Sequence, residues 1–189
     1  MVNVFPYAAS AAWYAAWLRS LSSDCPMEEA IADANISTQT DGKDFARTRI
    51  RGNAPGDEIL LSVAVVGGAS ILKQSRRLSH AILSEHSDWQ HNHLGALEAS
   101  YGRAPFFRYI FPDLKRIFSG YGQPLADFNR EIHNYICDFL NIRDILSVPL
   151  SDAAKERGKE LACEISPRLS IIDPLMRFGP ETILILRTL

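Results

Sequence analysis

An alternating pattern begins the hairpin-forming part of the chain: Phe45-Ala46-Arg47-Thr48-Arg49-Ile50-Arg51. Phe45 and the three arginines take every second position, and smaller or apolar side chains take the positions between them. Since successive side chains of a strand point to opposite faces, this pattern predicts a half-buried strand with its arginines on one face. Turn residues at 53–57 and an apolar, β-branched run at 58–66 come next, up to Gly67-Gly68. We therefore expect the two segments to pair as a β-hairpin.

The N-terminal side of the chain adds shorter elements around this hairpin. Val2–Phe5 is expected to form a first strand that ends at Pro6, and an Ala-rich run follows from Ala8 to Leu18. Aromatic side chains in that run recur at helical spacing, which predicts a buried helix face. Residues 24–40 are poorly patterned, and the polar stretch 37–42 is expected to form a loop. We expect a further short strand over residues 78–83.

Helical periodicity dominates from residue 88 onward. It predicts helices over 88–101, 125–139 and 151–165, an aromatic-rich segment over 106–118 that is broken at Pro112, and a last strand over 146–150. Asp173-Pro174 resembles a helix N-cap followed by proline, with Gly179 ending the short helix. The expected fold class is mixed α/β (α+β): a single domain spanning residues 1–189, with a strand-rich N-terminal half packed against a helical C-terminal half.

Composition argues against several classes of function. The 189 residues are 47% hydrophobic and carry 20 Lys+Arg against 22 Asp+Glu, a net charge of −2. This balance gives no global attraction to nucleic acid or to an anionic membrane. The apolar run Ala8–Leu18 is too short to span a bilayer and lacks the preceding basic residues of a signal peptide, so we expect a cytoplasmic protein. The three cysteines are widely spaced and are expected to be reduced, buried apolar residues.

His91 and His93 are the first candidates for a metal site. Residues two apart on a helix point about 200° from one another, so they cannot bind the same ion, and no metal or cofactor is expected. His93 alone shares a helical stripe with Trp89 and Tyr101. It fits either a histidine satisfied by a hydrogen bond at the edge of the core, or an acid or base in a pocket.

The arginines of the predicted strand also allow two interpretations. Arg47 and Arg49 can form a solvated face, or they can hold a phosphate or carboxylate through guanidinium forks, with Lys43 contributing at the strand entrance. Asp173 can likewise cap a helix or take part in a site.

Several segments resemble the WbqC-like protein family. The central motif has a tryptophan at 89, a histidine at 93 and a tyrosine at 101, and it ends in Pro105-Phe106-Phe107. Residues 125–129, which include Asn129, resemble the next helix start of the family, and residues 169–181, which include Asp173, are similar to the ending of its Bacteroidetes-type branch. Residues 46–50 resemble a degenerate Asn-Arg-Asn-Arg-Ile segment, in which both asparagines are replaced. The proline- and aromatic-rich beginning survives only around Phe5-Pro6-Tyr7 and Trp13-Tyr14, and the acidic, histidine-bearing segment is missing from residues 36–42.

The resemblance implies a transferase of surface-polysaccharide (O-antigen) biosynthesis that transfers glycine, an aminoacyl group or a related group. On that hypothesis His93 moves a proton, Trp89 and Tyr101 orient the substrate, and a small anionic or sugar-nucleotide ligand binds to five further residues: Arg47, Arg49, Lys43, Asn129 and Asp173. Because residues 36–50 diverge from the family, a second interpretation is that the protein is an inactive member. The alternative is a non-catalytic binding or scaffolding module, in the form of a homodimer built on the aromatic segment 106–118.

Overall fold

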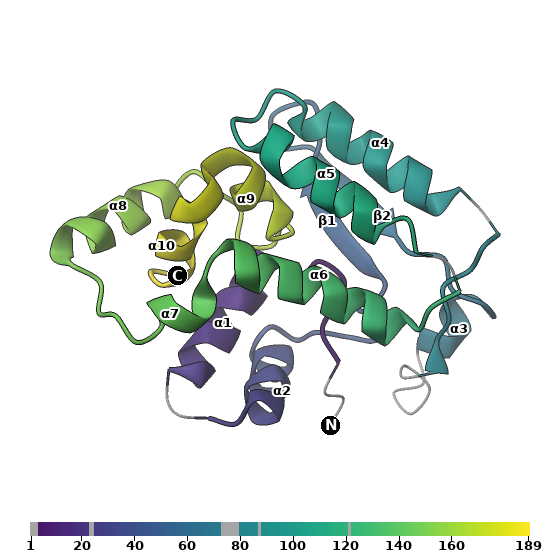
Figure 1. Cartoon of the computed structure of the whole chain (residues 1–189), viewed down its shortest axis with the longest axis horizontal. Helices are drawn as coiled ribbons and strands as arrows, with labels where there is room; N and C mark the ends of the chain where they lie inside the picture. Colours follow the sequence, from purple (N-terminus) through teal and green to yellow (C-terminus); the bar gives the residue numbers. More distant parts are fainter. Residues whose placement is uncertain (1–3, 23–24, 73–79, 87, 121) are drawn as a thin grey trace.

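The structure, a computed structural model, describes residues 4–22, 25–72, 80–86, 88–120 and 122–189 (Figure 1). The N-terminal part contains α1 (Ala11–Leu21), α2 (Met27–Ser37), β1 (Arg47–Arg51), β2 (Glu58–Ser62) and the short α3 (Ala69–Leu72). The remainder is helical: α4 (Trp89–Tyr101), α5 (Phe107–Ile117), α6 (Leu125–Phe139), α7 (Ile142–Ile145), α8 (Asp152–Ala162), α9 (Ile172–Phe178), the 3-10 turn η2 (Gly179–Glu181) and α10 (Thr182–Leu186).

The predicted hairpin forms with the expected alternation. β1 and β2 are antiparallel, with Arg47 opposite Ser62 and Arg51 opposite Glu58. Thr48 and Ile50 are buried, whereas the side chain of Arg49 is exposed. The hairpin packs against α4, which contacts both strands, and Figure 1 shows α4 and α5 lying together over the hairpin.

An aromatic core lies between α1 and α6. Trp13, Tyr14 and Trp17 of α1 are buried, as the helical spacing predicted. The imidazole of His133 on α6 stacks on Phe5 at 3.8 Å between ring centroids, and its Nδ1 lies 3.1 Å from the hydroxyl of Tyr14. Burial lowers the pKa of His133 to about 3, so this imidazole is neutral.

The N-terminal half is less rich in strands than we predicted. The poorly patterned segment 24–40, for which we predicted no regular element, contains α2, which packs against α1 through small side chains such as Ala30 and Ala34. Val4 and Phe5 are not part of a strand, while residues 2–3 of the predicted strand lie outside the described residues. Of the segment 78–83, Ile82 and Leu83 form only isolated bridges, and residues 78–79 also lie outside the described residues. The described part of the fold is therefore an α+β structure that is mostly helical.

The C-terminal half requires similar corrections. Residues 146–150 form no strand, because Pro149 cannot donate to a sheet and the preceding Val148 is exposed. α5 continues through Pro112, an exposed position at which solvent can satisfy the freed carbonyl group. Gly179 ends α9 as predicted, with a φ of +54°.

Three smaller expectations can also be compared with the structure. Cys25, Cys137 and Cys163 are free thiols, but Cys163 is exposed and the other two are only partly buried, because they lie near helix ends and surfaces. In the aromatic segment 106–118, the exposed large apolar side chain is that of Tyr109, and the others pack wholly or partly inward. Within the described ranges, no helix is long and apolar enough to cross a membrane.

Candidate functional site

A cleft of about 630 Å³ lies beside β1. Its walls come from the chain before and at the start of α1, from the end of α2 and the loop that leads to β1, from β1 itself, and from single residues of β2 and the segment before α9. The lining residues are Pro6, Tyr7, Ala9, Ser10, Ala12, Trp13, Ser37, Thr38, Thr40, Asp41, Lys43, Asp44, Arg47, Thr48, Arg49, Leu60 and Arg168.

Four cationic side chains line this cleft: those of Lys43, Arg47, Arg49 and Arg168. The carboxylates among its lining residues belong to Asp41 and Asp44, and Glu58 adds a third negative charge beside two of the arginines, so one positive charge is in excess although the whole chain carries −2. The cleft is thus a local basic site on a slightly acidic protein.

The three arginines of the cleft differ in how their charges are compensated. Glu58 on β2 pairs with both Arg49 (3.6 Å) and Arg168 (3.7 Å), and all three side chains are partly or largely exposed. Arg47 is half-buried and has no ion pair or hydrogen bond to the guanidinium among the residues that the structure describes. It is therefore the cleft cation that is best placed to gain from an incoming anion.

The loop before β1 is organised by its own carboxylates. Asp41 accepts a hydrogen bond from the backbone N–H of Lys43 at 2.6 Å, and Asp44 accepts one from the backbone N–H of Asp41 at 2.9 Å. Burial raises the pKa of Asp44, against the opposing effect of the hydrogen bond from Asp41. Both acidic side chains line the cleft, and the carboxylate of Asp44 interacts with the charges of Arg49 and Lys43.

A strained backbone position lies between Tyr7 and Ala9, two residues that line the cleft. Ala8 has a φ of +39°, in a region that side chains with a Cβ rarely adopt. Its carbonyl oxygen accepts hydrogen bonds from the hydroxyls of Thr48 and Ser170, both at 2.9 Å, and the backbone N–H of Ser170 donates to the carbonyl of Arg49 at 2.7 Å. The fully buried Ser170 thus connects the N-terminal segment to β1, and the surrounding bonds hold the strained turn.

His93 lies behind the cleft wall and is not one of the residues that line it. Its Nε2 is 3.2 Å from the carbonyl oxygen of Ser62, and because a carbonyl only accepts, Nε2 carries the proton. Nδ1 then accepts from the hydroxyl of Tyr7 at 2.8 Å. Burial lowers the pKa of His93 to about 4. His93 is therefore a neutral, fully hydrogen-bonded imidazole that reaches the cleft only through Tyr7.

Trp89 and Asn129 also lie in the protein interior rather than on the cleft wall. Trp89 donates from Nε1 to the carbonyl of Ser84 at 3.1 Å. The amide nitrogen of Asn129 donates to the carbonyls of Phe5 (2.9 Å) and Phe45 (2.8 Å), which precede two of the segments that form the cleft. Asn129 thus links, through hydrogen bonds, the two backbone segments that lead into the cleft lining.

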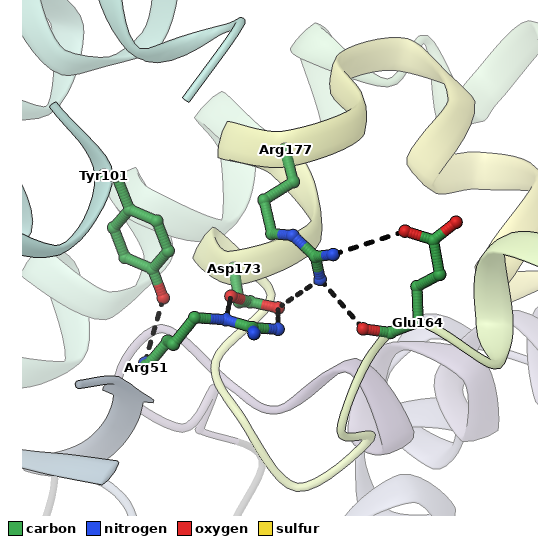
Figure 2. A network of polar contacts seen from close by, with 5 residues as sticks. All are labelled: Arg51, Tyr101, Glu164, Asp173 and Arg177. Atoms are coloured by element: carbon green, nitrogen blue, oxygen red, sulfur yellow. Dashed lines mark hydrogen bonds and ion pairs between the residues drawn. The ribbon is translucent and has the colours of Figure 1, made fainter. Parts of the chain in front are cut away.

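Tyr101 and Asp173 belong to a separate polar network at the far end of β1 (Figure 2). Asp173 is fully buried in α9, where its carboxylate lies 3.0 Å from Nε of Arg51 and 3.5 Å from Nη1 of Arg177. The hydroxyl of Tyr101 accepts from the backbone N–H of Arg51 at 3.1 Å, and Arg177 continues the network to Glu164. Asp173 is not the N-cap that its sequence suggested, because it lies inside α9 and makes no capping bond.

The structure thus brings together only part of the predicted site. Lys43, Arg47 and Arg49 share the cleft, whereas His93, Trp89, Tyr101, Asn129 and Asp173 do not line it. Sequence reasoning missed Asp41 and Asp44, although Asp41 lies in the polar run 37–42 that was predicted as a loop, and it missed Arg168, for which the sequence gives no local signal.

Comparison with known proteins identifies a family for this chain. The model of the WbqC-like protein family matches residues 38–166, which include the loop before β1 and both strands but neither the N-terminal wall of the cleft nor Arg168. Searches of curated proteins and of solved structures found no match. Because the family match covers more than half of the chain, the protein belongs to the WbqC-like protein family.

Proposed function

We propose that the cleft binds a small anionic substrate and that the protein is a transferase, which adds a glycyl, aminoacyl or related group to a sugar or nucleotide-sugar intermediate of surface-polysaccharide synthesis. The observation that carries the binding step is the uncompensated charge of Arg47 in a basic cleft. The reaction class in this proposal is the one that resemblance to the WbqC-like family implies.

Arg47 is a partly buried cation. A charge that is withdrawn from water is unfavourable unless a partner compensates for it. Arg49 and Arg168 already have Glu58, but Arg47 has no such group among the described residues. A phosphate or carboxylate would supply two acceptor oxygens to its fork and would also be attracted by the neighbouring cations.

The proposal assigns binding to the cleft residues and no proton transfer to His93. Both nitrogens of that imidazole are occupied, and its pKa of about 4 keeps it neutral near pH 7. Asp44 is a better candidate for proton transfer, because its carboxylate lines the cleft and burial raises its pKa.

The test is calorimetric titration of the protein with glucose 1-phosphate, a nucleotide sugar and pyrophosphate. Loss of a hydrogen bond to a charged group costs about 1.5–3 kcal/mol, so Arg47→Ala should weaken binding of the anionic ligands about 10- to 150-fold. Arg103→Ala removes an exposed arginine that is not part of the cleft and should leave the affinity unchanged. Absence of binding by all three ligands, or equal binding by the Arg47→Ala variant, would refute the assignment of the cleft.

A further inference from the structure

Glu58 on β2 contacts two arginines of the cleft, although it is not one of the lining residues. In the register of the hairpin, Glu58 lies opposite Arg51, and Leu60 lies opposite Arg49. Residues that are directly opposite in an antiparallel pair project from the same face of the sheet, and diagonal neighbours are within reach of long side chains. The position of Glu58 therefore allows it to pair with either Arg51 or Arg49.

The buried Asp173 decides between these two partners. Its carboxylate lies 3.0 Å from Nε of Arg51, so the guanidinium of Arg51 is directed toward α9 (Figure 2). The carboxylate of Glu58 instead lies 3.6 Å from Nε of its diagonal neighbour Arg49. The pairing of Arg51 with α9 thus leaves the negative charge of Glu58 beside an arginine that lines the cleft.

The second partner of Glu58, Arg168, is held in place by the backbone on both sides of it. Two N–H groups at the start of α1 donate to the carbonyls of Pro167 at 2.9 Å and of Leu169 at 3.0 Å. The bond from the backbone N–H of Ser170 to β1 fixes the segment a little further along. Arg168 is thereby kept beside β1, and its Nη2 lies 3.7 Å from the carboxylate of Glu58.

These contacts divide the arginines of the cleft into two groups. Arg49 and Arg168 share a carboxylate of the protein itself, whereas Arg47, on the same strand face as Arg49, has none among the described residues. A ligand anion at Arg49 and Arg168 would have to displace Glu58 or lie next to its like charge, and both are unfavourable. Exposed ion pairs of this kind contribute little to stability, so the main effect of Glu58 is on the charge that a ligand meets.

We infer that Glu58 is a specificity-determining residue, which occupies Arg49 and Arg168 and thereby limits the ligand to a single anionic group, held by Arg47. This inference rests on the proposed anion-binding function and narrows its substrate class to compounds with one such group. Two sources supply this chemistry: a sugar monophosphate and a sugar carboxylate. Without the charge of Glu58, the same cleft would hold a second anionic group at Arg49 and Arg168.

The test is calorimetric titration with glucose 1-phosphate and glucose 1,6-bisphosphate, which carry one and two phosphate groups on the same sugar. The unaltered protein should bind the bisphosphate no more than about fivefold more tightly, because the second phosphate gains only a screened attraction. Glu58→Gln keeps the shape of the side chain and removes its charge. In this variant the bisphosphate should bind at least about tenfold more tightly than the monophosphate, as expected for one additional charge-assisted contact.

Two further variants separate the position of the charge from the net charge of the protein. Asp57→Asn removes the same charge from the adjacent exposed residue, which has no ion pair with a cleft arginine among the described residues, and should behave like the unaltered protein. The double variant Glu58→Gln/Arg168→Ala should lose most of the gain in bisphosphate binding, because the second phosphate then meets only Arg49. A double variant that keeps the full gain would overturn the inference.

The remaining outcomes separate the two sources and the two proposals. Glucuronate carries one carboxylate, so tighter binding of glucuronate than of glucose 1-phosphate would identify a carboxylate as the anionic group, and weaker binding would identify a phosphate. A strong bisphosphate preference in the unaltered protein, no such preference in Glu58→Gln, or the same gain in Asp57→Asn would refute the role of Glu58 alone, provided that Arg47→Ala still weakens glucose 1-phosphate. No binding of any probe would refute the proposed function as well.

Discussion

Replacement of Asp173 by asparagine tests the network that fixes the end of β1. The side chain of Asp173 is fully buried, and its carboxylate is shared by Arg51 and Arg177, whose side chains are 38% and 23% exposed. Asparagine keeps one oxygen acceptor and nearly the same shape. The substitution therefore removes the negative charge that compensates two partly buried cations.

The expected cost follows from this geometry. Removal of one partner from a buried ion pair costs about 3–5 kcal/mol, because the other charge is left uncompensated. Both arginines can reach water from their partly exposed positions, so we expect the lower end, about 3 kcal/mol. A chain of this size changes its melting temperature by about 2–4 °C per kcal/mol, so Asp173→Asn should lower it by about 6–12 °C.

Thermal and urea unfolding followed by circular dichroism measure this change. Asp144→Asn, which alters an exposed aspartate of α7, should stay within about 0.5 kcal/mol of the unaltered protein. The double variant Asp173→Asn/Arg51→Gln should be more stable than the sum of the two single effects predicts, since it removes both members of the shorter pair. A loss below about 1 kcal/mol in Asp173→Asn, or strictly additive effects, would show that the network does not depend on the buried charge.

Two further substitutions probe the core and a tight helix end. Burial lowers the pKa of His93 to about 4 and of His133 to about 3, below the usual 6.5, so their contribution to stability is complete above pH 6.5 and is lost as the pH falls toward those lower values. As the pH falls through that window, each of the two histidines should lower the free energy of unfolding by about 1.4 kcal/mol per pH unit. Urea midpoints measured from pH 7 to 4.5 should therefore fall less steeply in His93→Gln than in the unaltered protein. Identical slopes would contradict a buried, neutral His93. Gly179→Ala should cost about 3 kcal/mol in urea unfolding, because its φ is +54° and a Cβ would overlap the ring of Phe106. Gly95→Ala, in an exposed part of α4 with open space around it, should instead stabilise by about 1 kcal/mol, and equal effects at the two glycines would refute the steric argument.

The elements that the sequence predicted well are those with strong local periodicity. The alternation at 45–51 and the turn at 53–57 depend on neighbouring residues only, and both appear in the hairpin. α2 was missed because its buried face consists mainly of alanines, whose weak hydrophobic contrast resembles that of a loop. The segment 146–150 failed in the opposite way, since its apolar residues suggested a strand although Pro149 and the exposed Val148 do not fit one.

The site was predicted less completely because it depends on contacts between distant segments. The stripe of Trp89, His93 and Tyr101 was recognised, yet periodicity alone cannot say whether a buried stripe faces a cavity or the core. Here it faces the core, where Tyr7 meets His93 across 86 positions of sequence. Arg168 enters the cleft from the segment before α9, and no local pattern around it could have shown this.

The three arginines of β1 show why such a pattern permits more than one function. Arg47, Arg49 and Arg51 share one face of the strand, and their spacing makes them equivalent in the sequence. Their roles differ because their partners lie elsewhere: Arg51 meets Asp173, 122 positions away, Arg49 meets Glu58 across the hairpin, and Arg47 meets no carboxylate among the described residues. Compensated charges hold the strand in place at one end, and the uncompensated charge is thereby presented to the cleft at the other. Substitution of Arg51 should therefore act mainly on the stability of the fold and substitution of Arg47 mainly on the ligand, even though the two residues differ only in position along one strand.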